Sequence, residues 1–203
     1  MTSVTLSYFD FPLGRGEECR LALHLAGVEF NDDRISFDDW PSKKPTMPYG
    51  AVPVLKIKGK PDLAQSNAIL GLIGDRHDLL PEDSFDAAHH IAILNFVEEL
   101  AMRVGETIQL PEDEKEEARK NLVDGFLKEW ASNIDNKIKG PFVGGDKISV
   151  ADIKLFVLVN TFKQKVFDYI PDDFLDSNEK LIALYKAVAS HPKIMEWYAL
   201  SNK

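Results

Sequence analysis

Tyr8 and Arg15 are residues whose types and spacing could stabilise an anionic sulfur. Tyr8 ends an alternating apolar and polar segment, and Arg15 opens the helical pattern that follows. A phenol can donate a hydrogen bond to a bound thiolate without ionising itself, and a guanidinium nearby adds positive charge. The alternative interpretation is a strand-end tyrosine that packs on a sheet, which is the commoner role of a lone tyrosine.

A second candidate site lies in the stretch from Ala51 to Ile69. A proline at the start of a strand gives up one hydrogen bond of the strand ladder. A cis Val52–Pro53 bond would explain why a proline stands here, because the cis bond leaves the preceding backbone free to pair elsewhere. Gln65 and Ser66 open a helical run, where N–H groups favour a carboxylate or phosphate. A turn and a serine cap without ligand is the alternative. Together the two features predict a groove for an extended, anionic, peptide-like molecule.

Other reactive residue types show no functional pattern. Cys19 lies inside the first helical pattern rather than at its N-terminus, where a reactive thiolate is favoured, so we predict a structural cysteine. The five histidines show no zinc-ligand spacing, and no glycine-rich phosphate loop is complete. The sequence therefore predicts no metal site. Ser149 and Asp152 have the spacing of a helix capping box, with a role in folding and none in catalysis.

The elements that must position the N-terminal candidates follow the order strand, helix, strand, short helix, hairpin, helix. The predicted strands are 4–8, 30–35, 54–57 and 62–64, and the predicted helices are 15–26, 38–44 and 66–77. This order predicts a mixed four-stranded sheet with helices against it. It resembles the thioredoxin-like arrangement, whose cis proline before the third strand matches Val52-Pro53.

After His77 the pattern becomes helical throughout. The predicted helices are 84–108, 111–138, 150–166, 177–190 and 192–200. On the first of them, three-four spacing predicts a set of core residues: Ile93, Val97, Leu100, Val104 and Ile108. We therefore predict an α/β thioredoxin-like domain over 1–78, a linker over 79–84, and an all-α helical bundle over 85–203.

Composition narrows the classes of partner. The chain has 203 residues, 44% of them hydrophobic, and a formal net charge of −9 without an extended basic cluster. Nucleic acid is therefore not an expected partner. No apolar segment has the length of a membrane span, and the N-terminus lacks a signal-peptide pattern. With a single cysteine, these features predict a cytoplasmic protein without disulfides.

Five segments in this order resemble the cytosolic glutathione transferases, and most closely the sigma class that includes glutathione-dependent prostaglandin D synthase. The resemblance covers essentially the whole chain. Its carriers are 8–9 with 14–17, 39–41, 48–55, 65–69, and 140–142 with 149–152. Glutathione is an extended tripeptide with two carboxylates, which agrees with the groove predicted from the residues.

The resemblance implies roles at both ends of the tripeptide. Tyr8 would hydrogen-bond the glutathione sulfur and lower the pKa of its thiol, and Arg15 would support the thiolate. Trp40 and Lys44 would hold the glycine carboxylate end. These four residues would thus place the thiol and one terminus.

The remaining implied contacts involve backbone groups and a second subunit. The backbone at Val52–Pro53 would pair with the cysteinyl part, as the cis proline permits. Gln65 and Ser66 would take the γ-glutamyl carboxylate at the helix N-terminus. Glu98 of the partner subunit would meet the γ-glutamyl amine, with Glu99 able to share that role. The resemblance therefore implies a homodimer.

Apolar residues predict the nature of the second substrate. Phe9, Phe11 and Leu13 lie in the first loop, and Met102 and Gly105 lie on the helix expected to face it. A hydrophobic electrophile would bind there. The alternative is that Phe11 and Leu13 only pack the domain junction.

The sequence thus predicts a glutathione transferase that activates the glutathione thiol as thiolate for conjugation to hydrophobic electrophiles. Glutathione is the expected co-substrate, with no metal, nucleic acid or membrane involved. Two alternatives remain open: a glutathione-dependent isomerase or peroxidase, and a glutathione-binding structural protein with little activity. The short connection after Ile108 favours an enzyme over the structural protein.

Overall fold

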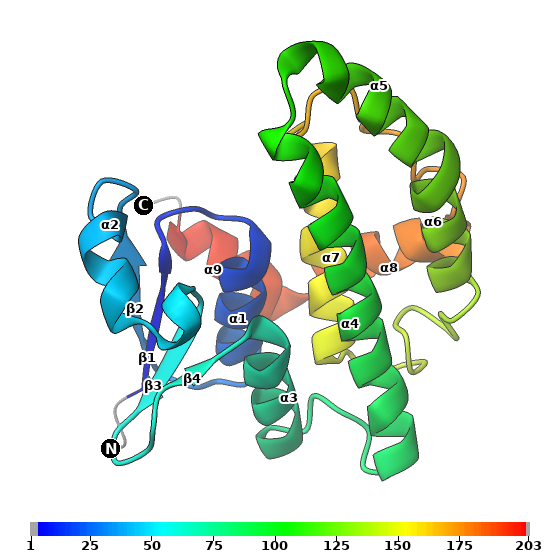
Figure 1. Ribbon diagram of the computed structural model, residues 1–203. Helices are drawn as coiled ribbons and strands as arrows, with labels where there is room; N and C mark the ends of the chain where they lie inside the picture. The colour runs from blue at the N-terminus through cyan, green and yellow to red at the C-terminus, as the bar shows by residue number, and fades with distance from the viewer. Residues whose placement is uncertain (1–3, 202–203) are drawn as a thin grey trace. The chain divides into compact units, whose positions relative to one another are not determined.

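The computed structural model describes residues 4–201, and its contacts divide the chain into two compact units (Figure 1). One consists of the chain up to Glu82 together with the segment from His191 onward, and the other is Asp83–Ser190. Residues 1–3 and 202–203 lie outside the described residues, so the predictions made for the N-terminus and for the two outer domain ends fall on positions that the structure does not describe. Within 4–201, no helix is long and apolar enough to cross a membrane.

The first unit contains a mixed sheet of four strands within the described residues, in the order β2-β1-β3-β4. The strands are β1 (Val4–Phe9), β2 (Asn31–Ile35), β3 (Val54–Ile57) and β4 (Leu63–Ala64). β2 is parallel to β1, whereas β3 is antiparallel to both β1 and β4. The predicted sheet, its mixed character and the cis Val52–Pro53 bond are confirmed.

Helices cover the sheet of this unit. α1 (Gly14–Leu25) and α3 (Ser66–Arg76) lie side by side against it, and α9 (Pro192–Ser201) contacts α1 (Figure 1). Because the sheet, α3 and α9 surround α1, most of its residues are buried. The segment between β2 and β3 forms three short elements: α2 (Trp40–Lys43) and the 3₁₀ turns Lys44–Thr46 and Pro48–Gly50.

α9 differs from the predicted domain division, which placed it with the second domain. Its contacts lie in the first unit: Lys193 Nζ donates to the Leu25 carbonyl at 2.8 Å, and Trp197 Nε1 donates to Glu17 Oε1 at 2.8 Å. A helical pattern predicts the helix but not the surface on which it packs, which explains the difference.

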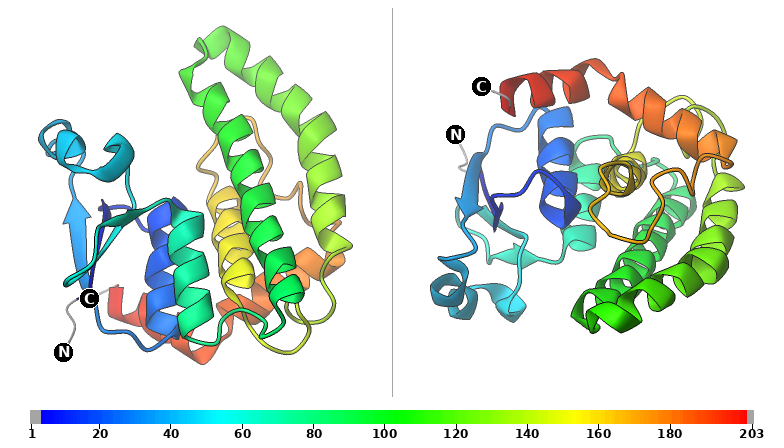
Figure 2. Two further views of the ribbon diagram at one scale, coloured as in Figure 1. Left: turned by 60° about the horizontal axis from the view of Figure 1, so that its bottom comes forward. Right: turned by 90° about the horizontal axis from the view of Figure 1, so that it is seen from above.

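The second unit is helical throughout its regular elements. They are α4 (Ser84–Glu106), a 3₁₀ turn (Thr107–Gln109), α5 (Glu112–Leu122), a π-helical turn (Val123–Leu127), α6 (Lys128–Asp135), α7 (Val150–Lys163) and α8 (Glu179–Ala189). α7 lies at the centre, beside α4 and α8 (Figure 2). The α/β and all-α parts of the predicted fold are therefore both present.

The start of α7 confirms the predicted capping box. Asp152 Oδ2 accepts from the Ser149 N–H at 2.8 Å and from the Ser149 hydroxyl at 2.6 Å, while Oδ1 accepts from the Val143 N–H at 2.7 Å. On α4 the core prediction is wrong at Ile108, whose side chain is 50% exposed. The α-helix ends at Glu106, and the following 3₁₀ turn moves Ile108 off the buried stripe.

Candidate active site

Tyr8 lies near the end of β1 and packs directly on the first turn of α1. Its side chain is 8% exposed. A Cβ placed on Gly16 would lie 1.9 Å from Tyr8 Cδ1, and one on Gly14 would lie 3.2 Å from the Tyr8 hydroxyl. Gly14 also has φ +69°, in the left-handed region that glycine favours. The two glycines therefore allow the helix backbone to approach the phenol closely.

The electrostatic surroundings keep the Tyr8 hydroxyl protonated. Burial raises the pKa of Tyr8 above its usual value near 10, and the Glu18 carboxylate raises it further. The positive charge of Arg15 and a backbone hydrogen bond from Gly16 lower the pKa without outweighing burial. Tyr8 therefore keeps its proton at neutral pH and can act as a hydrogen-bond donor.

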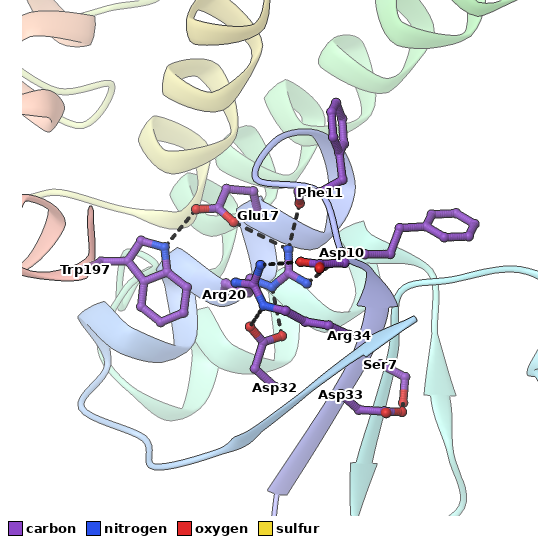
Figure 3. A network of polar contacts seen from close by, with 10 residues as sticks. Ser7, Asp10, Phe11, Glu17, Arg20, Asp32, Asp33, Arg34 and Trp197 are labelled. Atoms are coloured by element: carbon purple, nitrogen blue, oxygen red, sulfur yellow. Dashed lines mark hydrogen bonds and ion pairs between the residues drawn. The ribbon is translucent and has the colours of Figure 1, made fainter. Parts of the chain in front are cut away.

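Arg20 anchors the loop that follows Tyr8 (Figure 3). This fully buried guanidinium donates through Nη2 to the Phe9 carbonyl at 3.0 Å and through Nη1 to the Phe11 carbonyl at 2.9 Å. Its Cζ lies 5.6 Å from the centroid of the Tyr8 ring. Arg20 thus fixes the backbone on the C-terminal side of Tyr8, a role that the sequence interpretation missed.

Two carboxylates, Asp32 on β2 and Glu17 on α1, complete this network (Figure 3). Arg20 Nε donates to Asp32 Oδ1 at 2.9 Å, and Asp32 Oδ2 accepts from Arg34 Nε at 2.7 Å. Glu17, buried on α1, lies 3.5 Å from Arg20 and accepts the indole N–H of Trp197. Burial raises the pKa of Glu17, against the lowering effects of Trp197 and Arg20. The network joins α1, β2 and α9.

One available signal could have pointed to Arg20. Glu17 and Arg20 stand three positions apart on a helix whose other central residues include Cys19 and Leu21. Spacing of this kind places opposite charges on neighbouring positions. An arginine surrounded by apolar positions indicates a buried, hydrogen-bonded cation, because an isolated charge is rarely buried.

Trp40 and Val52 contact one small hydrophobic cluster. Both are partly buried against it, and its buried members are Ile35, Met47, Val54 and Ala64. The Trp40 ring meets Phe9 edge-on, with centroids 5.1 Å apart. Lys44 is exposed in the first 3₁₀ turn, and its Cε would lie 3.6 Å from a Cβ on Gly50.

Gln65 and Ser66 stand where the hairpin ends and α3 begins. Gln65 occupies the N-cap position, with φ 73°, and makes no side-chain capping hydrogen bond. Ser66 is the first helical residue and is buried. The serine is therefore inside the helix rather than at its cap. A non-glycine residue with a φ like that of Gln65 costs about 1–3 kcal/mol, and such residues concentrate at functional sites.

Predicted co-substrate residues of the first unit have different environments. Phe9 is partly buried and stacks on Phe37, with ring centroids 4.9 Å apart. Phe11 is partly buried, whereas Leu13 is buried at the N-cap of α1. Phe9 and Phe11 thus keep apolar surface that a ligand could contact, and Leu13 belongs mainly to the core.

The predicted site residues of the second unit lie along α4. Glu98 forms an ion pair with the buried Lys154, 3.1 Å from its Nζ, and Glu99 is exposed. Met102 is 57% exposed, and a Cβ on Gly105 would have open space around it. Among the described residues, no group of His, Cys, Asp and Glu side chains is arranged to hold a metal ion.

A thioredoxin-like unit with a tyrosine at the end of its first strand, combined with an all-α unit, defines a class of two-domain thioredoxin-fold proteins. Two protein-family models match the chain. The one described as the glutathione S-transferase N-terminal domain matches residues 4–74, and the C-terminal domain model matches residues 98–200. The chain belongs to the glutathione S-transferase family.

Individual relatives support this assignment over the full length. The glutathione S-transferase class-mu 28 kDa isozyme of Schistosoma japonicum is 32% identical over 197 residues, covering 94% of this chain and 90% of the relative. The prostaglandin synthase D structure of Nilaparvata lugens has a TM-score of 0.87 at 26% identity and covers 97% of each chain. The sigma class transferase of Fasciola hepatica has a TM-score of 0.85 at 26% identity, covering 100% of this chain and 98% of that chain.

These comparisons confirm the predicted family, its sigma-like character and the predicted enzyme class, glutathione transferase. Glutathione is the co-substrate of that family. The roles of individual residues in binding and activating glutathione stay predictions.

Proposed function

We propose that Tyr8 activates glutathione by donating a hydrogen bond to its sulfur, and that Arg15 supports the thiolate so formed. The observation that carries this proposal is a buried phenol whose raised pKa keeps it protonated at the first turn of α1. A free thiol with a pKa near 8.5 is only a few per cent ionised at neutral pH, and lowering this value by about two units makes most of it thiolate. The thiolate then attacks a hydrophobic electrophile.

The groove around the thiol would hold an extended anionic tripeptide. Trp40 and Lys44 would bind the glycine carboxylate end, and the Val52 backbone would pair with the cysteinyl part. The start of α3 would take the γ-glutamyl carboxylate at Gln65 and Ser66, because helix N-terminal N–H groups favour anions. The left-handed φ of Gln65 supports a functional constraint at this position.

The second substrate is proposed to be an apolar electrophile, as the partly exposed rings of Phe9 and Phe11 suggest. A second candidate reaction, glutathione-dependent isomerisation, is supported by the likeness to prostaglandin synthase D of Nilaparvata lugens. Rates with an aryl halide, an organic hydroperoxide and a prostaglandin endoperoxide would separate these reactions. A turnover confined to the endoperoxide would replace conjugation by isomerisation.

We also propose a cytoplasmic homodimer in which an acidic residue of α4 reaches the glutathione amine of the other subunit. Glu99 is exposed, while Glu98 is already paired with Lys154. Sedimentation equilibrium would give the mass of the assembly, and a monomer at micromolar concentration would contradict the dimer. Glu98→Gln and Glu99→Gln compared for glutathione affinity would identify the acidic residue involved.

Tyr8→Phe tests the central proposal. We expect this variant to retain glutathione affinity and to lose turnover of an aryl halide by about tenfold or more, because the thiol returns toward its ordinary pKa. Tyr169→Phe is a matched control, since Tyr169 is exposed and its hydroxyl donates to the surface residue Glu112. Unchanged turnover of Tyr8→Phe would exclude the role given to Tyr8.

A further inference from the structure

A cavity of about 430 Å³ opens on the first unit, at the C-terminal end of α1. Its walls come from α1, the loop that leads into β2, and α9. None of the residues predicted to hold glutathione lines it. Its volume lies within the range of small-molecule sites, about 300–1,000 Å³.

One wall of the cavity is aromatic. Phe30 and Trp197 lie nearly parallel, with an interplanar angle of 23° and centroids 6.1 Å apart, and the His24 ring lies 5.4 Å from Trp197. The indole N–H of Trp197 is held by Glu17 Oε1 at 2.8 Å. This hydrogen bond fixes the orientation of the indole, so the wall is preorganised for a planar ligand.

The polar groups of the cavity favour a cation. Three carboxylates line it: Glu29, Asp32 and Glu196. Asp32 is already paired with two arginines, which leaves Glu29 and Glu196 to face a ligand. Lys193 is the basic lining residue, and its ammonium is tied to the Leu25 carbonyl at 2.8 Å.

His24 lies beside Glu196 in the wall of the cavity. Its Nε2 is shielded from solvent and makes no hydrogen bond within the described part of the chain. Glu196 Oε2 lies 3.4 Å away but outside hydrogen-bond geometry.

We propose that this cavity binds a small aromatic amine in its protonated form. The ring would pack against Phe30 and Trp197, and the ammonium would lie beside the carboxylates of Glu196 and Glu29. Aromatic faces attract a nearby cation, and the carboxylates add charge attraction. Neither Tyr8 nor Arg15 lines this cavity, so amine binding can be tested separately from the proposed thiol activation, although Asp32 and Trp197 also belong to the Arg20 network.

Phenethylamine tests this proposal, with phenethyl alcohol as a neutral analogue and 3-phenylpropionate as an anionic one. Calorimetric titration of the full chain should give saturable binding of the amine, at least about tenfold weaker binding of the alcohol, and no binding of the acid. S-hexylglutathione should leave amine binding unchanged, because it would occupy the glutathione groove.

Variants locate the binding site. Glu196→Gln should weaken amine binding about tenfold, whereas Asp62→Asn, an exposed acidic residue in the β3–β4 hairpin, should leave it unchanged. Retained glutathione affinity in both variants shows that they are folded. The proposal is overturned by absence of amine binding, by equal affinity for the acid, by displacement with S-hexylglutathione, or by full affinity of Glu196→Gln.

Discussion

Replacing Arg20 by methionine should destabilise the protein and disturb the loop that follows Tyr8. The substitution keeps much of the side-chain volume but removes the donors to the Phe9 and Phe11 carbonyls and to Asp32. Breaking a buried ion pair by removing one partner costs about 3–5 kcal/mol. We expect about 3 kcal/mol, because Asp32 keeps Arg34 as a partner.

The functional consequence of the same change follows from the two carbonyls. Without Arg20, Phe9 and Phe11 lose the anchor that fixes the backbone beside Tyr8, so kcat/KM should fall even where the variant is fully folded. Arg20→Lys should give an intermediate result, since one ammonium keeps the charge but does not reproduce the planar fork of donors. Urea unfolding and aryl halide kinetics on the same preparations would measure both effects.

Glu17 provides an internal test of the explanation. Burial raises its pKa, so its charge is already disfavoured, and the loss of Arg20 leaves that carboxylate without its cation. Adding Glu17→Gln to Arg20→Met should therefore restore about 1 kcal/mol. The exposed Arg103, which stacks on the Phe126 ring, is the control, and Arg103→Met should cost less than about 1 kcal/mol. A wild-type urea midpoint and kcat/KM for Arg20→Met would refute this reasoning.

Two further substitutions test packing and protonation. Gly16→Ala should lower the free energy of unfolding by about 1–3 kcal/mol, because a Cβ at position 16 would lie 1.9 Å from the Tyr8 ring. Gly125→Ala is the control: a Cβ at position 125 would have open space around it, so this variant should not be destabilised. An unchanged urea midpoint for Gly16→Ala would contradict the packing of Tyr8 on α1. Burial raises the pKa of Asp152 from 3.8 to about 6, so the unfolded chain releases this proton first and the contribution of Asp152 falls as pH rises from about 4 to about 6. The unfolding free energy of the wild type relative to Asp152→Asn should drop by about 3 kcal/mol over that range, and a difference independent of pH would disprove the shift.

Local sequence patterns predict most of the secondary structure. Alternation and three-four spacing identified the strands and helices, and Ser149 with Asp152 marked the start of α7 because a capping box is satisfied within a few residues. Val52-Pro53 was likewise predicted as cis from its place before a strand. These features depend on residues that are close together in the sequence, so the amino-acid sequence alone is enough to predict them.

Features that depend on distant partners were not predictable in the same way. Trp197 reaches Glu17 across 180 positions, and no periodicity indicates that contact. The close packing of Tyr8 on Gly16 depends on how β1 meets α1, not on either segment alone. Ile108 was assigned to the core because its spacing continued that of α4, whereas the helix changes to a 3₁₀ turn before it.

The presence of a buried arginine in this network is better explained by positioning than by stability. Replacing both partners of a buried ion pair by apolar residues of similar volume is often neutral, so the pairing of Arg20 with Glu17 is not needed simply to hold a core together, although removing Arg20 alone is costly. Carbonyls of Phe9 and Phe11 and a carboxylate of Asp32 all converge on one guanidinium, whose planar fork presents five donors in fixed directions. An apolar residue could fill the same space but could not satisfy these acceptors. Arg20 therefore fixes the backbone beside Tyr8, and the thiol activation that we propose for Tyr8 relies on that geometry.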